Sequence, residues 1–189
     1  MKLTPTIAAA GAIATISGAA LAVISTFLPV VTLTSDSSIC VNQCFGTLTS
    51  SWWGFTENVD APQGGADFVS FQAGWLILAC VLAVTWGFNA LRRKPTRPML
   101  LFGIVSAILV STAVAVQFRA LSTFTHFWVK PGPISGWNRV DYGIGRPTQL
   151  LALGIICLGV AIYEVDMLLR ATSARTELAE ETEPVVGVA

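Results

Sequence analysis

Four long apolar stretches alternate along the chain with segments rich in Ser, Thr, Gly, Pro and charged residues. They cover residues 6–28, 69–91, 99–118 and 148–169. A helix needs roughly 20 mostly apolar residues to cross the hydrocarbon core of a bilayer. Backbone groups in lipid must hydrogen-bond within the protein, and the chain lacks the ten-residue alternating segments of a membrane β-barrel. The pattern therefore predicts an all-α integral membrane protein, a four-transmembrane-helix bundle.

The first stretch has a second interpretation. Lys2, the apolar run and the small residues of "GAALA" are also typical of a secretory signal peptide. The run is longer than the roughly 7–15 apolar residues of a signal peptide, which favours a retained helix. In either case the segment that follows begins on the outer side, so the expected topology of the rest is the same.

Lys and Arg are unevenly distributed around these stretches. None lies between Lys2 and residue 92, whereas the linker 92–98 carries Arg92, Arg93, Lys94 and Arg97. Two more, Arg170 and Arg175, follow the fourth stretch. Because cytoplasmic loops carry an excess of Lys and Arg, we expect an N-in/C-in topology. The loop 119–147 also carries four basic residues, which weakens the contrast without reversing it.

This topology divides the chain into a series of segments. They are a cytoplasmic N-terminus (1–5), a first span (6–28), a large extracytoplasmic loop (29–68), a second span (69–91), a cytoplasmic linker (92–98), a third span (99–118), a medium extracytoplasmic loop (119–147), a fourth span (148–169) and an acidic cytoplasmic tail (170–189). Leu121, Phe124 and Trp128 recur at helical spacing and predict a separate interfacial helix over 120–129. We expect the tail to extend the last helix briefly and then to be disordered.

The composition agrees with a chain whose main solvent is lipid. Of its 189 residues, 53% are hydrophobic and 12% are charged, whereas a soluble domain carries roughly 25% charged residues. The formal net charge is zero, and we expect no nucleic-acid partner. The expected partners are the lipid bilayer and other membrane proteins or a second copy of the chain. Spans rich in Ala and Val favour the plasma membrane of a bacterium with a GC-rich genome.

Small residues recur every fourth position in three of the spans, and such rows let helix backbones approach closely in lipid. The predicted helix-packing rows are Ala10, Ala14, Gly18 and Ala22 in the first span, Ala79, Ala83 and Gly87 in the second, and Gly103, Ala107, Ser111 and Ala115 in the third. Because these spans are rich in Ala, Gly and Ser, some rows also arise by chance. If two or more rows make contacts, the helices form a compact bundle without a wide aqueous pore.

Cys40 and Cys44 lie four residues apart in the first outer loop. In an oxidising compartment they could form a disulfide, if a turn brings them together. No His lies nearby to complete a metal site, so no metal is expected. Cys80 and Cys157 lie within spans, where cysteine usually acts as a small apolar residue.

Aromatic and basic side chains occur in both outer loops. Trp52 and Trp53 are either a partner-binding or lipid-binding tip, or an interfacial belt or local core of the outer loops. In the second outer loop, Trp128, Trp137 and Arg139 are expected at the membrane interface, where basic and aromatic groups could also hold an anionic headgroup or glycan. The one histidine, His126, has no visible catalytic partner.

Three polar residues lie in or near the ends of the spans: Asn89, Glu164 and Asp166. Acids within a span often belong to ion or proton routes. These two acids lie near the expected cytoplasmic face, where they could instead pair with Arg92, Arg93 or Lys94. We favour interfacial anchoring over transport.

No nucleotide-binding, zinc-protease, hydrolase or lipidation motif occurs, and no catalytic residue or cofactor is expected. Four spans with cysteines in a large first outer loop resemble the outline of tetraspan proteins such as claudins. The order of Trp motif and paired cysteines is reversed and respaced here, so the chain is not assigned to that family. The sequence favours a non-enzymatic accessory or interaction subunit of a cell-envelope membrane complex. The alternatives are a small transporter or channel component using Glu164, Asp166 and Asn89, and a membrane enzyme acting on lipid or glycan through His126, Asp141 and Arg139.

Overall fold

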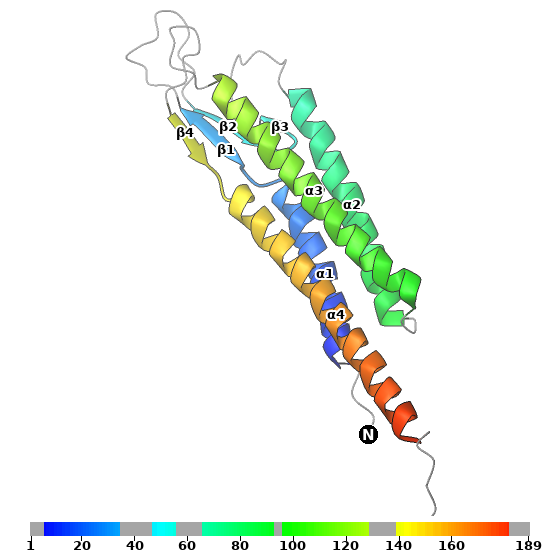
Figure 1. The fold of residues 1–189 in the computed structure, drawn as a ribbon. Helices are drawn as coiled ribbons and strands as arrows, with labels where there is room; N and C mark the ends of the chain where they lie inside the picture. Colours follow the sequence, from blue (N-terminus) through cyan, green and yellow to red (C-terminus); the bar gives the residue numbers. More distant parts are fainter. Residues whose placement is uncertain (1–5, 35–46, 56–65, 93–95, 129–138, 182–189) are drawn as a thin grey trace, which may run out of the picture.

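The computed structural model describes residues 6–34, 47–55, 66–92, 96–128 and 139–181, which form four helices and a small sheet (Figure 1). The helices are α1 (Thr6–Ser25), α2 (Ala66–Arg92), α3 (Arg97–Trp128) and α4 (Gly145–Glu181). The strands are β1 (Val31–Thr34), β2 (Thr47–Ser51), β3 (Gly54–Phe55) and β4 (Arg139–Tyr142). All four helices contain a segment long and apolar enough to cross a membrane, which confirms the helical spans expected from the hydrophobic pattern.

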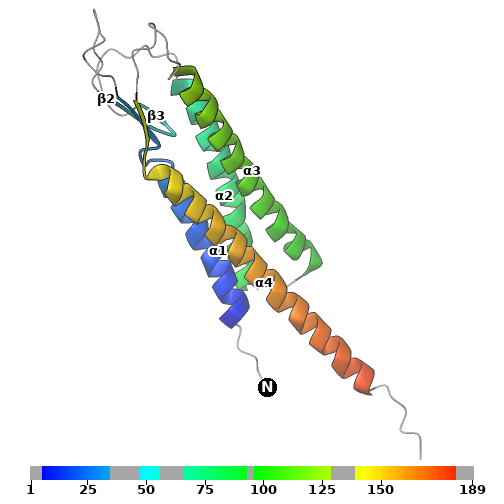
Figure 2. The ribbon, with the colours of Figure 1, turned by 60° about the vertical axis from the view of Figure 1, so that its left-hand side comes forward.

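The helices form two side-by-side pairs, α1 with α4 and α2 with α3 (Figure 1 and Figure 2). The two pairs meet chiefly where α1 contacts α2. The sheet lies at the end of the bundle where α1 ends and α4 begins, and α2 ends and α3 begins at the opposite end (Figure 1). We call these the sheet end and the linker end.

The expectation of an all-α fold is wrong at the sheet end. The four strands form an antiparallel sheet in the order β3-β2-β1-β4, in which β1 pairs with both β2 and β4. Val31 lies opposite Ser50 on one side and Tyr142 on the other. Burial alternates along β1: Val31 and Leu33 are buried, and Thr32 and Thr34 are half-buried. The alternation extends over four residues only, which is too short a pattern to separate a strand from a loop.

An apolar core fastens the sheet to the helix ends. Buried side chains of the β1 segment and the residue after β2 pack with Ala73 of α2 and Leu121 of α3; they are Val30, Val31, Leu33 and Trp52. Backbone hydrogen bonds tighten the junction: Trp52 N donates to Thr26 O at 3.2 Å, and Gly145 N donates to Pro29 O at 2.8 Å. The sheet is therefore held in a fixed position on the bundle.

Two helices are longer than expected. α3 continues without a break to Trp128, so residues 120–128 extend the third helix instead of forming a separate interfacial helix. α4 continues to Glu181, so much of the tail expected to be disordered is helical. Ala, Leu, Arg and Glu favour helix there, and Asp166 pairs with Arg170 one turn later at 2.7 Å. Residues 182–189 lie outside the described part of the chain.

The contact between α1 and α4 depends on glycine. A Cβ built on Gly159 would lie 2.6 Å from the carbonyl oxygen of Gly11 and 2.5 Å from Thr15 Oγ1. A Cβ on Gly11 would in turn lie 2.6 Å from the carbonyl oxygen of Gly159. The two backbones therefore touch at this level, as small residues permit in helices surrounded by lipid.

Only some residues of the predicted packing rows are buried. Six members are buried: Gly18, Ala22, Ala79, Ala83, Gly87 and Gly103. Three are half-buried (Ala14, Ala107 and Ser111), and Ala10 and Ala115 are exposed. At 3.6 residues per turn, a row of every fourth residue rotates by about 40° per step, so one end of a long row turns away from the neighbouring helix, as at Ala10 and Ala115. Toward α4, the contacting positions of α1 include Gly11, Thr15 and Gly18.

The Gly159 contact predicts opposite effects for the same substitution at two positions of α4. Gly159→Ala should lower the thermal unfolding midpoint in detergent, because overpacking against a backbone costs roughly 1–3 kcal/mol. A Cβ added at Gly154 would meet no neighbouring group of the described residues within 4 Å. Gly154→Ala should therefore leave the midpoint unchanged or raise it, because Ala favours helix by roughly 1 kcal/mol over Gly. Equal effects of the two substitutions would contradict the contact.

Candidate functional site

Three glutamines from three different helices meet near the sheet end. Gln72 of α2, Gln117 of α3 and Gln149 of α4 are all buried. Gln149 Nε2 donates to Gln117 Oε1, and Gln117 Nε2 donates to the backbone carbonyl of Gln72 at 3.2 Å. We call these residues the glutamine cluster. Hydrogen bonds between polar side chains join helices in lipid, so the cluster links α4, α3 and α2 at one level.

The bonding within the cluster is incomplete. Gln72 Oε1 and Gln149 Oε1 are buried and have no hydrogen-bond partner among residues 6–34, 47–55, 66–92, 96–128 and 139–181. The indole Nε1 of Trp52 is in the same condition. An acceptor buried without a partner costs roughly 1–3 kcal/mol, so each oxygen is a point where an exogenous hydroxyl, amine or water would be stabilised.

An arginine at the start of α4 packs between two aromatic rings. The guanidinium carbon of Arg146 lies 4.3 Å from the ring centroid of Tyr142 and 5.2 Å from that of Phe118. The Phe118 ring lies 6.4 Å from that of Trp52. Cation–π contacts of this kind tie the start of α4 to β4 and α3. Arg146 is thus held by the protein, and its charge is partly covered.

Trp52 and Trp53, which follow β2, lie in two different environments. Trp52 is 1% exposed and belongs to the core beneath the sheet. Trp53 is 38% exposed, stacks on Phe27 at 5.5 Å and donates from Nε1 to Thr26 Oγ1 at 2.9 Å. Trp53 and Phe27 therefore form a pinned aromatic patch on the surface at the junction of helix and sheet.

Charged groups on β4 face the surface. Arg139 and Asp141 are exposed and form an ion pair at 3.0 Å, which contributes little to stability at such a site. Tyr142 is exposed beside them. Trp137 lies outside the described residues, and Trp128 ends α3 with its side chain outside the description.

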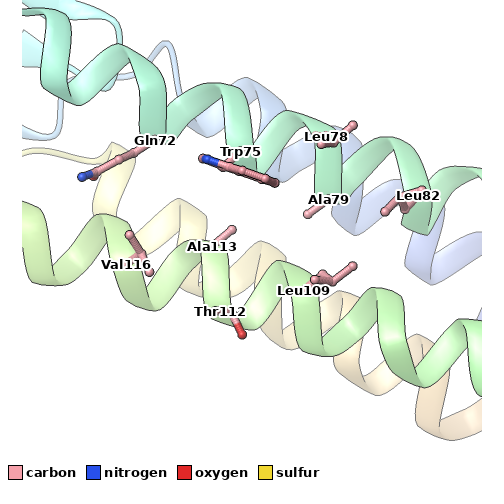
Figure 3. Close-up of a pocket in the computed structure, with 9 residues that line it drawn as sticks. All are labelled: Gln72, Trp75, Leu78, Ala79, Leu82, Leu109, Thr112, Ala113 and Val116. Atoms are coloured by element: carbon pink, nitrogen blue, oxygen red, sulfur yellow. The ribbon is translucent and has the colours of Figure 1, made fainter.

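A groove lies between α2 and α3, with a volume of about 470 Å³ (Figure 3). It is lined on α2 by Gln72, Trp75, Leu78, Ala79 and Leu82, and on α3 by Leu109, Thr112, Ala113 and Val116. Most of the lining is apolar, and Gln72 brings the glutamine cluster to one end of the groove. The sequence gives no sign of this groove, because it depends on which side chains of two helices face each other.

Two of the three polar residues predicted near the linker end, Asn89 and Asp166, are bonded within their own helices. Asn89 Nδ2 donates to the carbonyl of Thr85 at 2.9 Å, and Asp166 pairs with Arg170. Asp166 thus forms an i,i+4 pair on its own helix, and of the linker residues expected to pair with it, Arg93 and Lys94 lie outside the described residues. Arg92 lies 6.0 Å from the ring centroid of Phe88. Glu164 Oε1 is buried without a hydrogen-bond partner in the described part of the chain.

Two of the four cysteines lie in described parts of the chain, and both are free thiols. Cys40 and Cys44 lie outside the described residues. Cys80 is buried, and Cys157 is exposed on α4 with its Sγ 3.8 Å from Ser111 Oγ. Among the described residues, no three His, Cys, Asp or Glu side chains lie close enough together to hold a metal ion. His126 lies in α3, with its side chain outside the description.

Compared with models of known protein families, with characterised proteins and with solved structures, the chain matches none of them. Its function therefore has to be argued from its own surfaces and polar groups.

The glutamine cluster predicts energetic coupling between helices. Gln117→Leu and Gln149→Leu should each lower the free energy of unfolding, because each leaves its partner amide buried and unpaired. The double variant should lose less than the sum of the two, with a coupling of about 0.6 kcal/mol and at most about 1.7 kcal/mol. Unfolding of the wild type, the two single variants and the double variant in mixed micelles measures this coupling. Strictly additive losses would contradict the hydrogen bond between Gln149 and Gln117.

Proposed function

We propose that this protein is a non-enzymatic accessory or interaction subunit of a membrane complex at the cell envelope. The observation that carries the proposal is the position of the sheet. Backbone hydrogen bonds and an apolar core that includes Val30, Leu33 and Trp52 hold it on the bundle. A surface held in this way loses little conformational freedom when a partner binds, which favours affinity.

The side chains exposed at the sheet end are of the kinds that interfaces use. Phe27, Trp53 and Tyr142 are exposed aromatic residues. Arg139 and Asp141, on the other face of β4 from Tyr142, add one exposed charge of each sign. Aromatic residues and Arg are enriched in protein interfaces and among the residues that contribute most to binding energy. The exposed surface at the sheet end, which we call the sheet face, is the proposed partner-binding surface.

The proposed topology places the sheet face outside the cell and both termini in the cytoplasm. Its support is the distribution of charge, since Arg92, Arg97, Arg170 and Arg175 lie at or beyond the linker end of the helices. The excess of basic residues on the cytoplasmic side is the best general indicator of orientation. Under this proposal the membrane is the bacterial plasma membrane.

A transporter or channel component is the second candidate, and one observation favours it. Glu164 Oε1 is buried and has no hydrogen-bond partner among the described residues, as is typical of the intramembrane acids that proton routes use. Asn89 and Asp166 give it less support, because each is bonded within its own helix.

The topology is tested by cysteine labelling. In a background with Cys40, Cys44, Cys80 and Cys157 replaced by Ala, Tyr142→Cys should react with a membrane-impermeant maleimide on intact cells. Arg175 of α4 is also exposed, and Arg175→Cys should react only after permeabilisation. The reverse pattern would place the sheet face in the cytoplasm and overturn the proposed orientation.

The interaction role is tested by purification from native membranes in mild detergent. We expect the tagged chain to recover a partner in a fixed ratio, or to self-associate, and Tyr142→Ala to reduce the recovery. Phe88→Ala changes an exposed aromatic residue at the linker end and should leave recovery unchanged.

Two results would contradict the interaction role. One is the absence of any stable partner or self-association. The other is proton-coupled flux in reconstituted vesicles that is lost in Glu164→Gln, which would favour the transporter.

A further inference from the structure

The groove between α2 and α3 begins at the membrane interface. Gln72 lies five residues after Asp67, near the start of the apolar part of α2, and at the sheet end of the groove, across from Val116 (Figure 3). The opposite end is formed by Leu82 and Leu109 (Figure 3). At about 1.5 Å per helical residue, ten residues from Gln72 to Leu82 cover about 15 Å. This is half of the roughly 30 Å hydrocarbon thickness, so the groove extends through one leaflet.

The groove is a narrow slot. Its floor contains Ala79, which is buried, and Ala113, which is half-buried, while the larger side chains of Trp75, Leu78 and Val116 are exposed at its edges. The lining is almost entirely apolar, and the small side chains of Ala79 and Ala113 leave space between the two helices. Such an apolar groove on a surface that faces lipid suits a hydrocarbon chain.

The polar end of the slot offers a hydrogen-bond acceptor. Gln72 is buried, and its Oε1 has no partner among the described residues. Another polar lining group, the hydroxyl of Thr112, already donates to the carbonyl of Ile108 at 2.9 Å. A carboxamide oxygen accepts hydrogen bonds and donates none, so its complement is an N–H or O–H group. At the depth of Gln72, such groups belong to the polar part of a lipid.

We propose that this slot binds one acyl chain of a lipid in the leaflet on the sheet side, with an N–H or O–H group of the same lipid donating to Gln72 Oε1. The apolar lining accepts the chain, and the acceptor at the end of the slot selects lipids that carry a donor. This inference goes beyond the proposed interaction role and does not depend on the identity of a protein partner.

The test measures lipid bound to the full chain. Protein is reconstituted in nanodiscs of phosphatidylcholine, which lacks a headgroup donor, with either phosphatidylethanolamine or phosphatidylglycerol added. Release into mild detergent and native mass spectrometry then count the retained lipids. We expect one retained lipid per chain, enriched in a donor-bearing lipid over phosphatidylcholine. The two added lipids distinguish an ammonium donor from a hydroxyl donor.

Matched variants separate the slot from the general lipid-facing surface. Ala113→Phe fills the floor of the slot and should reduce retention by about tenfold or more. Ala115→Phe changes an exposed residue two positions away on α3 and should leave retention at the wild-type level. Thr112→Phe blocks the slot from an exposed position and provides the same test if Ala113→Phe fails to fold. Gln72→Leu should keep the chain bound but abolish the preference for donor-bearing lipids.

Three outcomes would overturn the proposal. They are equal retention in Ala113→Phe and Ala115→Phe, retention of phosphatidylcholine as strongly as of both donor-bearing lipids in the wild type, and a change of oligomeric mass with unchanged lipid in Ala113→Phe. The last outcome would assign the slot to a protein contact.

Discussion

The backbone contact between α1 and α4 at Gly11 and Gly159 is the constraint on which the rest of the structure depends. β1 follows α1 after a short connection, and β4 precedes α4 by two residues. The two helices therefore set the distance and register at which β1 and β4 can pair. The hydrogen bonds of Gly143 N to Val30 O and of Gly145 N to Pro29 O close the same junction. A side chain between the helices would separate the strands as well as the spans.

The second helix pair completes the sheet end and creates the features with functional interest. Trp52 and Leu33 pack on residues of α2 and α3, which brings Gln117 between Gln72 and Gln149. The same arrangement leaves small side chains facing each other farther down α2 and α3, at Ala79 and Ala113, and these open the slot. The proposed interaction surface and the proposed lipid slot thus both depend on one arrangement of four helices.

The four spans were predictable because length and apolar content alone decide whether a helix can cross a bilayer. The sheet was not, because its strands have two to five residues and β1 pairs with β4, which lies near the other end of the chain. Trp52 and Trp53 could not be told apart, since one is buried and the other exposed only once the sheet meets α2 and α3.

The positions of the three glutamines are visible in the sequence, but the sequence alone does not show that they touch. Gln72, Gln117 and Gln149 each lie within a few residues of the sheet end of an expected span and hence at a common depth. In contrast, the predicted packing row of the first span includes Ala10, whereas the contact with α4 is made by Gly11. Which of the two faces α4 depends on the rotation of α1 about its axis. Depth can be estimated from span limits, but helix rotation requires the tertiary structure.

Hydrogen–deuterium exchange of the β1 and β4 amides in Gly11→Leu tests most directly whether the helix contact supports the sheet. The account predicts faster exchange in both strands together with the facing turns of α1 and α4, at a temperature where α2 and α3 stay protected. Unchanged protection of β1 and β4, with exchange confined to α1 and α4, would contradict it.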